Sequence, residues 1–118
     1  MDARAEDRRK NMSELLKKQM EMPLMLAKLI IYAYEQLGYT ITFGEGFDDD
    51  GIGHMKGSVH YIKLGQDLNI FKDGQWLSKG PEMEKAHNKL HDKWDELGGA
   101  KRIPKDLNHY SIEFQGKR

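Results

Sequence analysis

The dipeptide Asp73-Gly74 constrains the fold more than any other feature of this sequence. It stands between two strand-like runs, residues 66–71 and 76–77. Asp-Gly favours the tight two-residue turn that joins antiparallel strands, because both of its positions tolerate positive φ angles. The sequence therefore predicts a β-hairpin here, and with it an antiparallel sheet.

The N-terminal third predicts two helices separated by a proline. Residues 1–21 are mostly charged, with apolar residues at helical spacing, and are expected to form an exposed amphipathic helix. Pro23 interrupts this pattern. Because proline is tolerated in the first turn of a helix, a second helix is predicted to begin there and to end at Leu37, with Gly38 as its stop.

The remaining segments complete the outline of one domain. Strands are expected at residues 39–43, 58–62 and 110–114, and a helix from Pro81 to the pair Gly98-Gly99. Residues 44–57 are rich in glycine and aspartate and are expected to form an irregular loop. A length of 118 residues allows one hydrophobic core. We therefore predict a single α+β domain over residues 1–118, with helices packed on a small antiparallel sheet.

Charge and composition exclude several functional classes. The 19 basic residues balance the 19 acidic ones, so no bulk field would draw the chain to nucleic acid or to an anionic membrane. The longest apolar stretch is far shorter than the ~20 residues that span a bilayer, and the charged N-terminal segment is unlike a signal peptide. Without cysteine, disulfides and thiolate metal sites are excluded, and a metal would need histidine, carboxylate or carbonyl ligands.

Three residues have the chemistry of a catalytic zinc site, which takes three protein ligands and leaves one position for water. His60 closes the run Ser58-Val59-His60, Asp67 follows seven positions later, and His109 closes Asp106-Leu107-Asn108-His109. A separation of seven does not place two side chains on one face of a straight strand, because side chains alternate. A bend near Gly65 would bring His60 and Asp67 together.

These segments resemble the M15 family of zinc peptidases, the D-alanyl-D-alanine carboxypeptidase and L-alanyl-D-glutamate endopeptidase group of bacteria and phage endolysins. The similarity rests on the two runs above, on the position of Asp67, and on residues 67–74 and 108–113, and it covers about residues 20–118. It implies that His60, Asp67 and His109 bind Zn²⁺ at the sheet, in a D,D-peptidase-like fold. It also implies that Asp106 is the general base, which takes a proton from the metal-bound water.

The same resemblance implies a biological setting. The expected substrate is a peptidoglycan stem peptide, cut by an endolysin of phage or prophage origin. Such a protein would be synthesised in the host cytoplasm and would act in the periplasm or cell wall after the membrane is permeabilised. We expect a monomer that neither inserts stably into a membrane nor binds nucleic acid.

Substrate binding departs from the family pattern. An arginine that commonly binds substrate carboxylate or the oxyanion in this family corresponds to Asp48 here, and a carboxylate cannot do that work. Lys63 is the favoured replacement, with Lys56 and Arg102 as alternatives, and Ser58 is expected to hydrogen-bond to substrate. Two other functions stay open on this basis: a metal-binding or peptide-binding module without turnover, and a D-alanyl-D-alanine dipeptidase.

The other histidines and the tryptophans are expected to have no role in catalysis. His87 and His91 lie four positions apart on a helix rich in lysine and glutamate, so a solvated face is favoured over a second metal site. His54 is interpreted as a plain loop residue. Trp76 and Trp94 are expected in the core rather than in a peptide groove.

Overall fold

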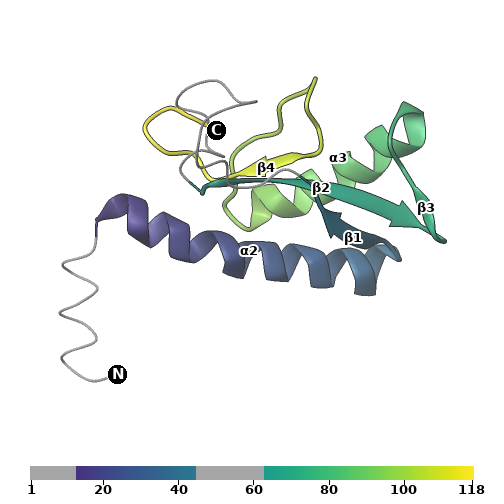
Figure 1. The fold of residues 1–118 in the computed structure, drawn as a ribbon, viewed down its shortest axis with the longest axis horizontal. Helices are drawn as coiled ribbons and strands as arrows, with labels where there is room; N and C mark the ends of the chain where they lie inside the picture. The colour runs from purple at the N-terminus through teal and green to yellow at the C-terminus, as the bar shows by residue number, and fades with distance from the viewer. Residues whose placement is uncertain (1–12, 45–62) are drawn as a thin grey trace.

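The computed structural model describes residues 13–44 and 63–118 of the chain. Two helices, α2 (Glu14–Leu37) and α3 (Gly80–Glu96), pack with a small antiparallel sheet, as Figure 1 shows. The predicted α+β class is thereby confirmed. The predicted strand at 58–62 and most of the predicted loop at 44–57 lie outside the described residues.

Strand β2 (Gly65–Lys72) is the centre of the sheet and pairs with all three other strands. It runs antiparallel to β1 (Thr40–Phe43), to β3 (Gln75–Trp76) and to β4 (His109–Ser111). The predicted hairpin is confirmed between β2 and β3, where Asp73 and Gly74 have φ angles of 51° and 78°. These positive values are the ones that the tight hairpin turn requires.

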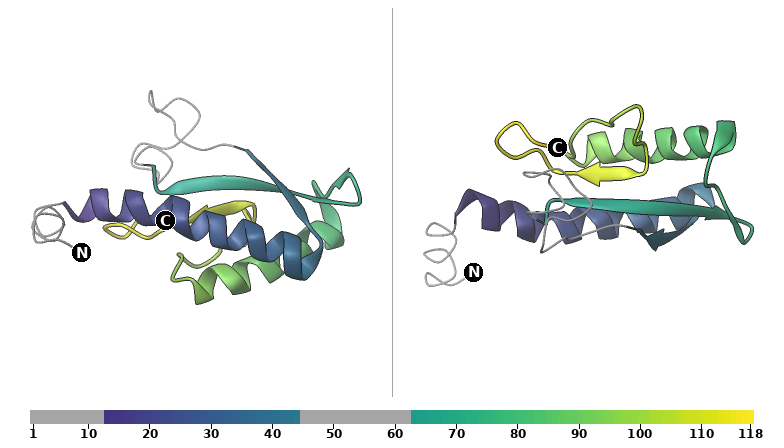
Figure 2. Two further views of the ribbon diagram at one scale, coloured as in Figure 1. Left: turned by 90° about the horizontal axis from the view of Figure 1, so that it is seen from below. Right: turned by 45° about the horizontal axis from the view of Figure 1, so that its top comes forward.

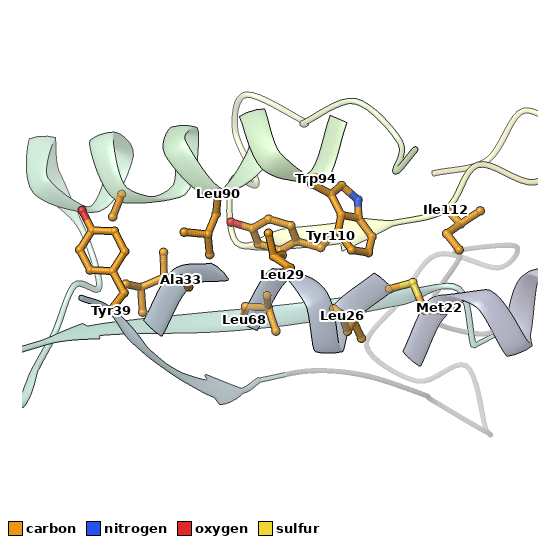
Figure 3. Packing of buried hydrophobic residues seen from close by; sticks show 12 residues of the cluster. Met22, Leu26, Leu29, Ala33, Tyr39, Leu68, Leu90, Trp94, Tyr110 and Ile112 are labelled. Carbon is orange, nitrogen blue, oxygen red and sulfur yellow. The ribbon is translucent and has the colours of Figure 1, made fainter. Parts of the chain in front are cut away.

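Both helices pack into one core with β2 and β4, and the left view of Figure 2 shows them on the same side of β2. Leu68 and Ile70 of β2 and Tyr110 of β4 are fully buried against them. Figure 3 shows how side chains from α2 and α3 meet Leu68 and Tyr110 in one core. Since strand side chains alternate, Asp67 and Asn69 lie on the other face of the sheet.

Helix α2 differs from the prediction at Pro23. The structure has one continuous helix from Glu14 to Leu37, where a helix break was expected at the proline. Ser13 caps its N-terminus by accepting a hydrogen bond from the Leu16 N–H at 3.1 Å. Proline lacks a backbone N–H, yet the apolar stripe of Met22, Leu26, Leu29 and Ala33 is buried on both sides of it. Tertiary burial of this stripe outweighs the local preference for a break.

Helix α3 matches the prediction closely at both ends. Pro81 lies in its first turn, and Gly98, with a φ of 94°, follows its last residues. No helix in the described ranges is long and apolar enough to cross a membrane.

Candidate active site

Two of the three predicted metal ligands meet across strands β2 and β4. The register of this ladder places Asp67 directly opposite His109, on the sheet face that points away from the helices. The His109 Nδ1 atom lies 3.3 Å from the Asp67 Oδ1 atom. The histidine is buried and the aspartate side chain is 19% exposed, so solvent reaches the pair through the aspartate.

The distance between these two atoms is that of a hydrogen bond or, where the imidazole is protonated, an ion pair. The donor set, one imidazole and one carboxylate, is also one that Zn²⁺ accepts.

The other predicted members of this centre cannot be compared with the structure. Ser58 and His60 lie outside the described residues, as do Asp48, His54 and Lys56. Within residues 13–44 and 63–118, no group of three histidine or acidic side chains is close enough to hold a metal ion. The pair Asp67–His109 therefore needs a ligand from elsewhere in the chain to complete a zinc site.

Asp106 lies on a tight turn that leads into His109. Its N–H donates to the Ile103 carbonyl at 2.8 Å, and its carbonyl accepts from the His109 N–H at 3.1 Å. The Leu68 N–H donates to the Asn108 carbonyl at 2.8 Å, which fixes this turn to β2. These bonds hold the backbone of Asp106 on both sides, and its side chain is exposed.

His87 and His91 are buried, so the expected solvated face was wrong. Their exposed fractions are 2% and 0%. His87 Nδ1 is hydrogen-bonded to the Tyr110 hydroxyl at 2.8 Å, and the His91 ring stacks on the Tyr110 ring with 4.1 Å between centroids. The His91 Nε2–H donates to the Leu107 carbonyl at 2.7 Å, since a carbonyl can only accept. Helix α3 thus supports the turn between Asp106 and His109 from behind.

Both histidines are held in the neutral form. Burial lowers the pKa of His87 to about 4, with a further contribution from nearby His91. Burial also lowers the pKa of His91 to about 4, against the opposing effect of its hydrogen bond to Leu107. Burial raises the pKa of the Tyr110 hydroxyl. The cluster is therefore uncharged at neutral pH, as suits its place in the core.

A pocket of about 180 Å³ opens beside this turn. Its lining joins the sheet, α3 and the segment before β4, and consists of Leu68, Asn69, Trp76, Leu77, Ser78, Met83, His87, Lys105, Asp106, Leu107 and Asn108. Trp76 is 57% exposed at this pocket, so its expected place in the core was wrong, whereas Trp94 is fully buried as expected. No local sequence signal predicts this pocket, because its walls come from three separate segments.

Two of the cations considered for substrate binding are placed away from this pocket. Arg102 is engaged by Asp92 and Asp95, with N–O distances of 2.7 and 3.2 Å. Lys63, exposed and with a φ of 62°, lines a different and largely apolar pocket of about 500 Å³ between α2 and the strands. The structure thus brings Asp67 and His109 together and leaves Lys63 and Arg102 elsewhere.

Comparison with known proteins adds no identification. No family model, curated protein or solved structure matches the chain.

Proposed function

We propose that this chain is a zinc-dependent peptidase that cleaves peptidoglycan stem peptides by means of metal-activated water. The observation that supports it best is the approach of Asp67 and His109 to 3.3 Å across β2 and β4. These residues are distant in sequence, and their ligand chemistry and spacing predict a shared metal site. Their contact supports, in particular, a metal site on the sheet face opposite the helices.

In this proposal His60, Asp67 and His109 hold the ion. Zinc, when bound, supplies a Lewis acid and a water whose pKa is lowered to ~7. Asp106 would serve as the general base toward the attacking water and as the general acid toward the departing amine. The 3.1 Å hydrogen bond from the His109 N–H to the Asp106 carbonyl closes the turn that joins the proposed base to the proposed ligand.

The wider setting is proposed on the resemblance to the endolysin group. The chain would act as a monomer on the cell wall, after the membrane has been permeabilised. Ser58 would hydrogen-bond to substrate near the metal. Lys63 is also expected to bind substrate. Its position supports this role less well, because Lys63 lines the pocket beside α2 and not the pocket that Asp106 lines.

Zinc content and hydrolysis rate, measured in the same variants, distinguish the proposed metal ligands from the proposed base. Asp67→Ala and His109→Ala should lower zinc content from one per chain toward zero and abolish release of new amine ends from muropeptides. Asp106→Asn should retain zinc and lose at least about a hundredfold in rate, as expected for removal of general base catalysis. Glu113→Gln, an exposed carboxylate near the C-terminus, is the matched control and should change neither quantity.

Two results would count against the proposal. Equal zinc content in wild type, Asp67→Ala and His109→Ala would remove the metal site from this face of the sheet. Stoichiometric zinc in the wild type with no hydrolysis of muropeptides or of the D-alanyl-D-alanine dipeptide would leave a metal-binding module without turnover.

A further inference from the structure

Helix α2 is apolar on two opposite faces. Its core face holds Met22, Leu26, Leu29 and Ala33, all of them buried. At about 3.6 residues per turn, a second set of apolar residues points away from the core: Met20, Leu24, Ala27, Ile31 and Tyr34. A helix that is apolar all round is normally covered on all sides. The outward face of α2 therefore lacks a partner that its sequence calls for.

We call this second set the outer stripe. Its large side chains are exposed, by 54% at Met20, 66% at Leu24 and 67% at Tyr34, and Ile31 and Ala27 are exposed as well. In Figure 1, α2 forms the lower edge of the molecule, with β2, β4 and α3 above it. The steps of four, three, four and three residues along the outer stripe match the spacing by which two helices pack in a coiled coil.

A row of alternating charge runs along one side of the outer stripe. It consists of Lys17, Glu21, Lys28 and Glu35. In an antiparallel pair of α2 helices the same side of both stripes comes together, and the row of the second copy reads in the reverse order. Each lysine then meets a glutamate, Lys17 with Glu35 and Glu21 with Lys28, and two-fold symmetry forms each pair twice. Such flanking pairs set the orientation of paired helices.

The register that forms these pairs also uses the whole helix. When Glu14 of one copy lies opposite Leu37 of the other, the two 24-residue helices overlap completely, over about 36 Å. Met20 then lies opposite Ile31, and both charge pairs fall within two residues of this register. Charge, apolar spacing and helix length thus select one arrangement.

A parallel pair has no such complementarity. It would place the charged row of one copy against the other side of the partner's stripe. That side carries Pro23 and Ile30, which offer no charge. The antiparallel orientation is therefore the one that the side chains favour.

We propose that the outer stripe of α2 binds the outer stripe of a second copy of this chain, in an antiparallel helix pair. The inference does not depend on the proposed peptidase function. A contact about 36 Å long and roughly 10 Å wide is smaller than the ~800 Å² per partner of a standard interface, so the dimer should dissociate in the micromolar range. Dilution below that range leaves the monomer proposed to act at the cell wall.

Sedimentation equilibrium of the full chain, over concentrations that bracket the micromolar range, measures the dissociation constant. Leu24→Glu should raise it at least about tenfold, because each copy then brings an unpaired charge into the apolar contact. The matched control Gln36→Glu adds the same charge to α2 outside the outer stripe and should leave it unchanged. Both side chains are exposed, so circular dichroism should report the same helix content in both variants and in wild type.

A charge exchange tests the antiparallel register. Lys28→Glu replaces two attractive pairs by two repulsive ones, so it should weaken the dimer roughly threefold to tenfold. Adding Glu21→Lys to the same chain restores the pairing and should return the dissociation constant to within about twofold of wild type. This recovery would be absent in a parallel or unspecific association.

Disulfide trapping tests the same register without energetics. The chain has no cysteine, so Met20→Cys and Ile31→Cys each supply one thiol. On oxidation, a mixture of the two variants should form the mixed disulfide in preference to either homodimer, because positions 20 and 31 face each other only in the antiparallel pair. A monomer at all concentrations, or a dimer that Leu24→Glu leaves intact, would overturn the proposal. Predominant homodimeric disulfides, or no recovery in the charge exchange, would overturn the antiparallel arrangement.

Discussion

At the scale of single residues, Tyr110 joins the core to the candidate site. Its ring is fully buried, stacks on His91 and meets Trp94 edge to face with 6.0 Å between centroids. Its hydroxyl is bonded to His87 Nδ1 at 2.8 Å. This one side chain therefore ties β4 to α3 by packing and by a buried hydrogen bond, which is strongest where water is excluded.

Tyr110→Phe removes only the hydroxyl and tests this bond. The substitution leaves the His87 Nδ1 atom buried without its partner, so the free energy of unfolding should fall by about 1–3 kcal/mol. Urea denaturation measures the change. Tyr34→Phe, at a side chain that is 67% exposed, is the matched control and should stay within about 0.5 kcal/mol of wild type. Equal stability of the two variants would mean that the buried bond contributes nothing.

At the scale of elements, the end of α3 depends on a close contact between backbone and core. The Gly99 N–H donates to the Trp94 carbonyl at 2.9 Å, and the Trp94 indole N–H donates to the Ser111 carbonyl at 2.9 Å. A Cβ atom at position 99 would overlap the Trp94 ring. Glycine at this position lets the chain leave α3 and pass directly over its own buried tryptophan.

Gly99→Ala should therefore be costly, by about 3 kcal/mol, because the indole or the backbone must shift. Gly98→Ala provides the comparison: position 98 has a positive φ of 94° but open space around it, so only strain of about 1 kcal/mol is expected. Thermal unfolding of both variants checks the order. A smaller loss for Gly99→Ala than for Gly98→Ala would contradict the packing argument.

Element positions followed well from local sequence signals. The Asp73-Gly74 turn and the limits of α3 depend on the backbone preferences of a few residues, and these were predicted. Pro23 was read as a break, because its effect on α2 is decided by the burial of distant residues. The burial of His87 and His91 was also missed. Their spacing with Leu90 and Trp94, at i, i+3, i+4 and i+7, was the available signal of a core stripe.

The candidate site was predictable only in part. Ligand chemistry and spacing selected Asp67 and His109, whose contact the structure describes. Nothing local in the sequence specifies that β4 pairs with β2 or that β3 takes the other half of the same edge. The pocket with Lys105 is a product of this long-range arrangement, so it was not anticipated.

At the scale of the whole molecule, the buried histidines make stability depend on pH. In the unfolded chain a histidine pKa near 6.5 is expected, whereas in the folded state the pKa of His87 and that of His91 are lowered to about 4. Between these values the unfolded chain binds more protons than the folded one. Stability is therefore complete above pH 6.5 and is lost as the pH falls toward 4.

Urea unfolding should show a loss on the order of 5 kcal/mol between pH 7 and pH 4.5 from these two groups. Proton resonances of the imidazole rings give the matching observation: His87 and His91 should titrate about two units below an ordinary histidine while the protein stays folded. Imidazole pKa values near 6.5 for both rings would contradict the neutral buried cluster.

The alternation of side chains along β4 places a residue of the candidate site next to a residue of the core. His109 and Tyr110 are neighbours that point to opposite faces of the sheet, one toward Asp67 and the other into the core. A substitution that loosens Tyr110 must also displace His109, because they share one peptide bond. A screen for the proposed activity would therefore score changes in Tyr110, and in the α3 residues that hold it, as if they lay in the candidate site.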